Sequence, residues 1–174
     1  MMIVSNRKDA SMKGTAVLGL ILALTLAGCG NSSKTSAADQ RVQQQADYYA
    51  IDQIEKTWHK AASTHNIDLM MTLWAPDATF NIATKTLHGT AQIRAFFKTA
   101  GPFLPGHHWV SDTPAYKIRI TASGDKGTLY FECHYIDVKT QKVVSVAGAD
   151  QTVQKINGKW LITTSAGATP TLGG

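Results

Sequence analysis

The stretch from Thr128 to Ser165 constrains the fold more than any other part of the chain, because it predicts three long strands in succession. In Thr128–Val138, apolar side chains alternate with polar ones and therefore share one face of a strand. A second strand is predicted over Val143–Ile156 and a third over Lys159–Ser165, with Asn157-Gly158 as a two-residue type I′ turn between them. Such an antiparallel meander has one face to bury, so helices elsewhere in the chain must cover it.

Three helices are predicted upstream of these strands. The first begins near Ala46 and runs to about Thr64, because apolar residues recur there every three or four positions. Asn66 is the predicted cap of a short second helix over Ile67–Trp74, and a third helix is predicted over Ala91–Thr99. Helices gathered on one face of a strongly curved antiparallel sheet define an α+β fold. The sheet and the long helix would enclose a cone that is either packed core or a pocket.

The first 28 residues are predicted to be a lipoprotein signal peptide. Basic residues precede the apolar run Ala16–Leu26, which is too short to span a bilayer as a mature helix. Both Met1 and Met12 are candidate starts. The run ends in Leu26-Ala27-Gly28-Cys29, which resembles a bacterial lipobox and implies cleavage before Cys29 and lipidation of its sulfur. The alternative is a plain signal peptide followed by a chance cysteine.

The rest of the chain divides into three segments. Residues 29–45 hold the lipidated cysteine and a polar, flexible tether, residues 46–165 form the domain, and residues 166–174 are a tail. Cys133 would then have no cysteine partner, and its place on an apolar strand face predicts a small buried side chain. We therefore expect a protein of the cell envelope, anchored to a membrane and facing the periplasm or the exterior.

Charge and motif content argue against several functional classes. The formal net charge of +5 falls to +3 without the first 28 residues, and the remaining basic residues are scattered, so nucleic-acid binding is not predicted. The six histidines show neither H-x-E nor H-E-x-x-H spacing. The chain also lacks a glycine-rich phosphate loop and a G-x-S-x-G elbow. We predict no metal and no cofactor.

Five motifs along the domain resemble those of one protein superfamily. They are His65–Asp68 with Leu73–Phe80, Leu87–Ile93, His108–Asp112, Gly148–Asp150 and Asn157–Ile162. In this order they are similar to the nuclear transport factor 2-like superfamily and, within it, to the SnoaL-like polyketide cyclases. The resemblance covers about Ala46 to Ser165. It implies a cystatin-like roll, in which a cone-shaped, strongly curved antiparallel sheet packs against three N-terminal helices.

The resemblance suggests some activities and argues against others. The superfamily includes isomerases, dehydratases, cyclases and domains that only bind, so the fold alone does not define the activity. In the ketosteroid-isomerase branch, the general base corresponds to Ile82 and the oxyanion-stabilising tyrosine to Trp58. Neither residue can do that chemistry, so steroid-type isomerisation is rejected. The SnoaL-like cyclases use an acid on the penultimate strand, and Asp150 lies there.

Asp150 is therefore the candidate acid/base, with His108 at the mouth of a strand as its assistant. The alternative for Asp150 is an exposed position or an ion pair with Lys155 or Arg119. His108 is equally compatible with a surface position.

The candidate ligand pocket is formed mainly by aromatic side chains. Its predicted members are Trp58, Phe97, Trp109, Tyr49 and His134. For the aromatic residues, core packing is the alternative. His134 shares a strand face with Glu132, and that face is either the pocket wall or, as the pattern favours, the outer surface.

Together these features predict a lipoprotein whose domain binds a small, largely apolar molecule. The sequence is compatible with two roles: an acid–base reaction of the cyclase, isomerase or dehydratase kind, or ligand binding and protein docking without catalysis. A homodimer through the exposed sheet face is a further alternative.

Overall fold

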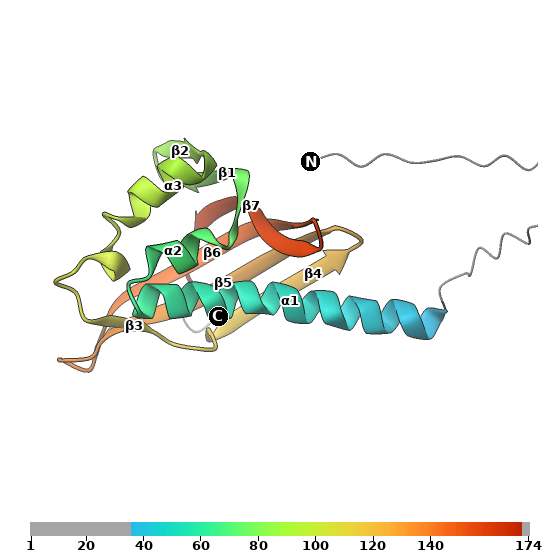
Figure 1. Cartoon of the computed structure of the whole chain (residues 1–174). Coiled ribbons are helices and arrows are strands. Elements are labelled where there is room, and N and C mark those ends of the chain that lie inside the picture. Colours follow the sequence, from blue (N-terminus) through green and yellow to red (C-terminus); the bar gives the residue numbers. More distant parts are fainter. Residues whose placement is uncertain (1–35, 172–174) are drawn as a thin grey trace, which may run out of the picture. The chain divides into compact units, whose positions relative to one another are not determined.

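The computed structural model describes residues 36–171. The predicted signal peptide and Cys29 lie outside the described residues. The domain contains three α-helices, a 3-10 helix and a single sheet of seven strands, which confirms the predicted α+β class (Figure 1). The elements are α1 (Ala37–Ser63), α2 (Ile67–Met71), β1 (Trp74–Ile82), β2 (Lys85–His88), α3 (Gly89–Phe97), η1 (Gly101–Phe103), β3 (Trp109–Ser111), β4 (Lys117–Ser123), β5 (Lys126–Asp137), β6 (Lys142–Ile156) and β7 (Lys159–Ala168).

Helix α1 begins at Ala37, well before the predicted start near Ala46. Ser36 and Asp39 form a capping box, in which each side chain accepts a hydrogen bond from the other residue's backbone N–H. The glutamine-rich stretch after the cap has good helix propensity although it buries little. The segment predicted as flexible tether is therefore helical from Ala37 onward. Among residues 36–171, no helix combines the length and apolar character needed to cross a membrane.

The predicted second helix is shorter than expected, and the strand after it is longer. Asn66 caps α2 as predicted, with its side-chain oxygen 2.8 Å from the backbone nitrogen of Leu69. The helix ends at Met71 and β1 starts at Trp74, because residues before a proline favour extended backbone. A register shift between Trp74 and Thr79 accommodates Pro76 within the strand.

The sheet order is β2-β1-β7-β6-β5-β3, and β4 also pairs with the long strand β5. The three-strand meander β5-β6-β7 is antiparallel, as predicted, whereas β1 pairs with β7 in parallel. Asn157 and Gly158 both have positive φ angles, 50° and 78°, and form the predicted tight turn between β6 and β7. These connections build the long curved strands that surround the core.

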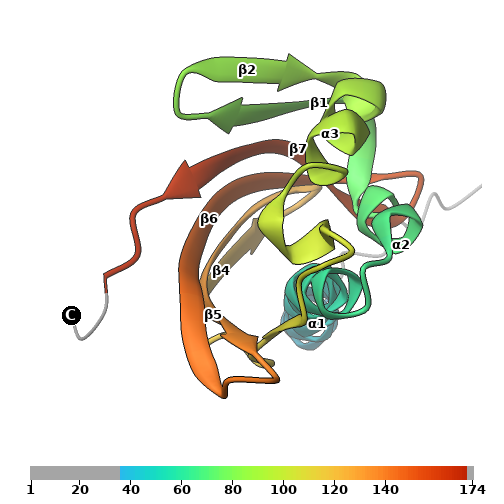
Figure 2. The ribbon, with the colours of Figure 1, turned by 90° about the vertical axis from the view of Figure 1, so that its left-hand side faces the viewer.

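Helix α1 covers the concave side of this sheet. In Figure 2 the strands β5, β6 and β7 form an arc, and α1 and the segment containing η1 lie on its inner side. The buried side chains of α1 include Ile51, Ile54 and Trp58, and they pack against inward-facing residues such as Phe131 and Ile162. The sheet does not close completely onto the helices, and the space left between them contains the candidate site.

Candidate functional site

A cavity of about 420 Å³ lies between the concave face of the sheet, α1 and the segment that follows α3. Eight aromatic residues line it: Trp58, Phe80, Phe96, Phe97, Phe103, Trp109, Phe131 and Tyr135. The part of the lining that belongs to β6 and β7 consists of small residues: Ser145, Ala147, Gly148, Ala149, Ser165, Ala166 and Gly167. Small side chains on these two strands, surrounded by large rings from the other elements, leave room for a guest molecule.

Trp58 organises the aromatic wall. Its ring centroid lies 5.5 Å from that of Phe97 and 5.8 Å from that of Phe131, and both contacts are edge-to-face. Phe97 in turn contacts Phe103 edge-on at 5.3 Å. Aromatic pairs in this geometry attract one another beyond their burial, so these four rings are a connected unit rather than a set of independent side chains.

Trp109 forms the part of the wall nearest the loop. The His107 ring stacks on it with centroids 4.3 Å apart, and His107 Nδ1 lies 2.8 Å from the carbonyl oxygen of Gly101. A Cβ atom on Gly101 would come within 2.6 Å of the Trp109 ring, so only glycine allows this close approach. The loop and the indole therefore fix one another at the edge of the cavity.

The cavity wall carries little ionisable chemistry. Among the described residues that line it, Tyr135 is the only one with a titratable side chain. Burial raises the pKa of the Tyr135 hydroxyl well above its ordinary value, so this group stays protonated and neutral. The wall therefore offers hydrogen-bonding hydroxyl and indole groups, but no carboxylate, imidazole or ammonium.

Three of the five predicted pocket residues line this cavity: Trp58, Phe97 and Trp109. Tyr49 does not, because it lies on the outward side of α1 with 66% of its surface exposed. It borders a separate shallow groove that includes Leu69 and Trp160. The prediction that Tyr49 lines the pocket is wrong, because the periodicity of α1 directs Ile51 and Ile54 inward and Tyr49 outward.

The two predicted catalytic residues are not brought together at the cavity. Asp150 is exposed, because alternation along β6 sends Ala149 and Gln151 inward and Asp150 to the other face. It forms no ion pair with Lys155, whose ammonium contacts Asp47 instead. His108 is also exposed and is absent from the cavity lining. Neither residue can reach a molecule in the cavity. The prediction that Asp150 and His108 lie at the ligand site is therefore wrong.

His134 lies on the face of β5 that points away from the cavity, the alternative that the sequence pattern favoured. Its Nδ1 atom is 2.9 Å from Asp112 Oδ2, and its ring stacks on Tyr116 with centroids 4.5 Å apart. The next inward residue, Tyr135, lines the cavity in its place. His134 therefore belongs to a cluster on the outer surface of the sheet.

Glu132 is the centre of that outer cluster and is fully buried. Its carboxylate accepts hydrogen bonds from the hydroxyl groups of Tyr130 and Tyr116, and from the backbone N–H of Thr171 at 2.8 Å. Burial by itself raises the pKa of Glu132, but these donors outweigh it and hold the pKa well below its ordinary value. The segment after β7, predicted as a loose tail from residue 166, is strand to Ala168 and then docks on this carboxylate.

The sequence analysis missed a second buried pair, on α1. His59 Nδ1 lies 2.7 Å from Glu55 Oε1, and the same oxygen accepts a hydrogen bond from the backbone N–H of Ala115 at 2.8 Å. Both side chains have no exposed surface, and neither lines the cavity. Their spacing of four residues could have indicated the pair. Its visible effect is to hold the connection between β3 and β4 against the helix.

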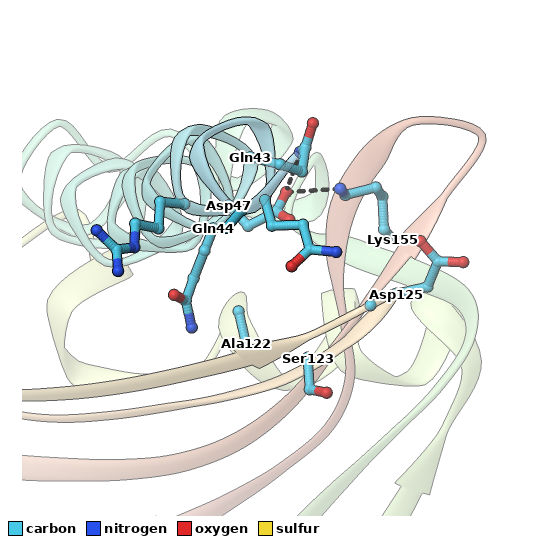
Figure 3. A pocket seen from close by; sticks show the side chains of 11 residues that line it. Gln43, Gln44, Asp47, Ala122, Ser123, Asp125 and Lys155 are labelled. Carbon is cyan, nitrogen blue, oxygen red and sulfur yellow. Dashed lines mark hydrogen bonds and ion pairs between the residues drawn. The ribbon is translucent and has the colours of Figure 1, made fainter. Parts of the chain in front are cut away.

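A larger hollow, of about 740 Å³, lies between the first half of α1 and the turn from β4 to β5. Figure 3 shows Asp47 at its edge, in contact with Gln43 and Lys155. Asp47 Oδ1 is 2.5 Å from Lys155 Nζ and 3.1 Å from Trp160 Nε1. Because Asp47 is already paired with Lys155, and most of the residues that line the hollow are polar, we assign the ligand site to the smaller aromatic cavity.

The fold is that of the nuclear transport factor 2-like class. An NTF2-like protein with a cystatin-like fold from Novosphingobium aromaticivorans is similar, with a TM-score of 0.66 and 16% identity over 78% of this chain and 90% of that chain. An NTF2-like protein of unknown function from Pseudomonas putida has a TM-score of 0.63 and 15% identity over 72% and 88%. An NTF2-like superfamily protein from Salmonella enterica has a TM-score of 0.57 and 16% identity over 78% and 96%.

The amino-acid sequence identifies the protein family. A model of the SnoaL-like domain matches residues 56–161, and the chain therefore belongs to the SnoaL-like domain family. Among curated proteins, no sequence matches this chain. Among residues 36–171, no group of three or more His, Cys, Asp or Glu side chains is arranged to hold a metal ion.

Proposed function

We propose that this domain binds a small, neutral, largely apolar molecule in the aromatic cavity and does not transform it by acid–base catalysis. The observation that carries the proposal is the cavity itself, about 420 Å³ in volume and walled by eight aromatic side chains. Burying apolar surface of a guest against such a wall is favourable. Since no described lining residue carries a charge, a charged guest would lose its hydration without gaining a partner.

The position of the ionisable groups supports binding over catalysis. A general base must come within hydrogen-bonding distance of the proton that it removes. Asp150 is on the other face of the sheet, and Glu55 and His59 do not line the cavity. Ile82, at the position of the isomerase branch's base, is apolar and also absent from the lining. Tyr135 has a raised pKa and cannot serve as a base near neutral pH.

We also propose that the domain works at a membrane surface of the cell envelope, held there by lipidation of Cys29. The support is the sequence Leu26-Ala27-Gly28-Cys29 directly after an apolar run. Apolar molecules concentrate in membranes, so a binding domain anchored beside one would meet them at high local concentration. The role of the protein would then be to capture or carry such a molecule.

A docking role is the second candidate. It is favoured by three valines exposed around the β5–β6 hairpin: Val138, Val143 and Val144, with 45%, 54% and 41% of their surface exposed. Exposed apolar side chains that gather in one place are typical of contact surfaces. This role would use a different part of the domain, so it is compatible with ligand binding in the cavity.

Two substitutions at neighbouring positions of β6 test the binding proposal. Ala149→Phe adds a ring inside the cavity, and Asp150→Phe adds the same ring on the outer face. Equilibrium dialysis of the purified full-length chain against 1-tetralone, a neutral bicyclic ketone, measures binding. We expect saturable one-to-one binding by the wild type and Asp150→Phe, and its loss in Ala149→Phe. No saturable binding by the wild type, or equal binding by both variants, would contradict the proposal.

A further inference from the structure

One polar pair stands out in the apolar interior of the cone. Gln151 on β6 and Ser165 on β7 are cross-strand partners, with 1% and 0% of their surface exposed. Ser165 lines the cavity, and Gln151 follows the lining residues Ala147 and Ala149 on the inward face of β6. The pair therefore lies at one end of the row of small residues that forms the sheet wall of the cavity.

The geometry determines what this pair can offer to a guest. Gln151 Nε2 lies 3.5 Å from Ser165 Oγ and donates to it. The serine oxygen is thus occupied as an acceptor, and within residues 36–171 its own hydroxyl proton has no recorded acceptor. Gln151 Oε1 is also buried without a partner. Buried polar groups in native proteins are nearly always hydrogen-bonded. Gln151 does not line the cavity, whereas Ser165 does, so the hydroxyl proton of Ser165 is the group that a molecule in the cavity can accept.

We propose that Ser165 donates a hydrogen bond to a neutral carbonyl oxygen of the bound molecule, and that Gln151 is the positioning residue that holds the serine oxygen. The ligand class is then a compact apolar ring system that bears a neutral acceptor oxygen, for which a ketone is the probe used below. A hydroxyl proton requires an acceptor, which excludes a pure hydrocarbon as the best ligand. A carboxylate is disfavoured because no cationic side chain lines the cavity. This inference rests on the proposed function and specifies its ligand.

The test compares 1-tetralone with tetralin, which has the same bicyclic skeleton but a methylene group in place of the carbonyl. We expect the wild-type full-length chain to bind tetralone more tightly than tetralin. Ser165→Ala should weaken tetralone binding roughly three- to tenfold, the effect of one neutral hydrogen bond, and leave tetralin binding unchanged. Ser165→Cys should show the same loss, because a thiol is a weak donor. Gln151→Met, similar in shape but without the amide, should reduce the preference for tetralone in the same direction.

Ser145→Ala is the matched control, since Ser145 also lines the cavity but lacks a buried amide behind it. It should leave the preference for tetralone intact. If the wild type binds both compounds equally, or Ser165→Ala weakens both equally, the carbonyl contact is refuted while cavity binding stands. If Ser145→Ala removes the preference, the contact is assigned to the wrong serine. If neither compound binds the wild type, the proposed function fails and this inference fails with it.

Discussion

Ala149 lines the aromatic cavity, and Asp150, the next residue of β6, lies exposed on the opposite face of the sheet. The two residues pair with Phe131 and Tyr130 on β5, which lie on the inner and outer faces in the same alternation. A shift of one residue in this register would have brought a carboxyl group to the cavity and made acid–base chemistry there plausible. The observed register instead separates the only acid of this strand from the ligand site.

Replacing the Asp150 carboxylate should therefore have little effect. We expect Asp150→Asn to change the free energy of unfolding by less than about 0.5 kcal/mol, because the side chain is exposed and forms no recorded ion pair. Affinity for 1-tetralone should also be unchanged. Urea denaturation and equilibrium dialysis check the two expectations. A clear gain in stability on loss of the charge would show that the carboxylate is desolvated inside the fold, contrary to this account.

Replacing the Glu132 carboxylate should lower stability, in contrast to Asp150, because Glu132 is buried and accepts hydrogen bonds from tyrosine hydroxyls and Thr171. Its folded pKa is lowered from 4.5, so its contribution to stability is present above about pH 4.5 and is lost as the pH falls toward the folded pKa. We expect Glu132→Gln to lower the melting temperature at pH 7, with the gap to wild type narrowing below pH 4.5. Asp150→Asn, the same chemical change at an exposed site, is the control. A gap that is constant with pH would refute the assignment.

Cys133 is fully buried on the inward face of β5, as the strand pattern predicted. Burial raises the pKa of its thiol to about 12, so the reactive thiolate is scarce at pH 8. We expect a thiol reagent to label Cys133 slowly in the folded protein and rapidly in urea, in a chain carrying Cys29→Ser so that only one cysteine is present. Rapid labelling without urea would show that the strand face is open to solvent.

The proposed membrane anchor depends on Cys29, which precedes the described residues. We expect Cys29→Ala to remove the acyl mass from the intact protein and to block its processing or release it from the membrane fraction. Mass spectrometry and cell fractionation check this outcome, with Cys133→Ala as the control that keeps the lipobox. Wild-type protein without an acyl group would contradict the anchor proposal.

The fold could be predicted well because the signals that define it are local. Alternation in Thr128–Val138, the Asn157-Gly158 turn and the Asn66 cap each specify a short piece of backbone, and each is present in the structure. The predicted element boundaries are wrong where pairing between residues distant in the sequence determines the structure. Trp74 joins the sheet because it pairs with Ile162 of β7, a contact that no local pattern indicates.

The site was harder to predict because it depends on which face of each element turns inward. The inward position of Trp58 follows from helix periodicity. That of Tyr135 follows from strand alternation, because it shares one face of β5 with Phe131 and Cys133. The family resemblance suggests a position in the cavity for Asp150, whereas its alternation with Ala149 along β6 indicates the outer face. Ser165 and Gln151 meet across two strands, and the single-strand pattern gives no sign that their side chains share a hydrogen bond.

The most direct test of ligand binding in the cavity is an NMR measurement of intermolecular nuclear Overhauser effects between 1-tetralone and the methyl groups of the full-length chain. The account predicts contacts to the methyl groups of Ala147 and Ala149, which line the cavity. It predicts none to Val143 or Val144, which are exposed near the β5–β6 hairpin. Contacts to the valines without contacts to the alanines would show that the compound binds the surface and would contradict the central claim.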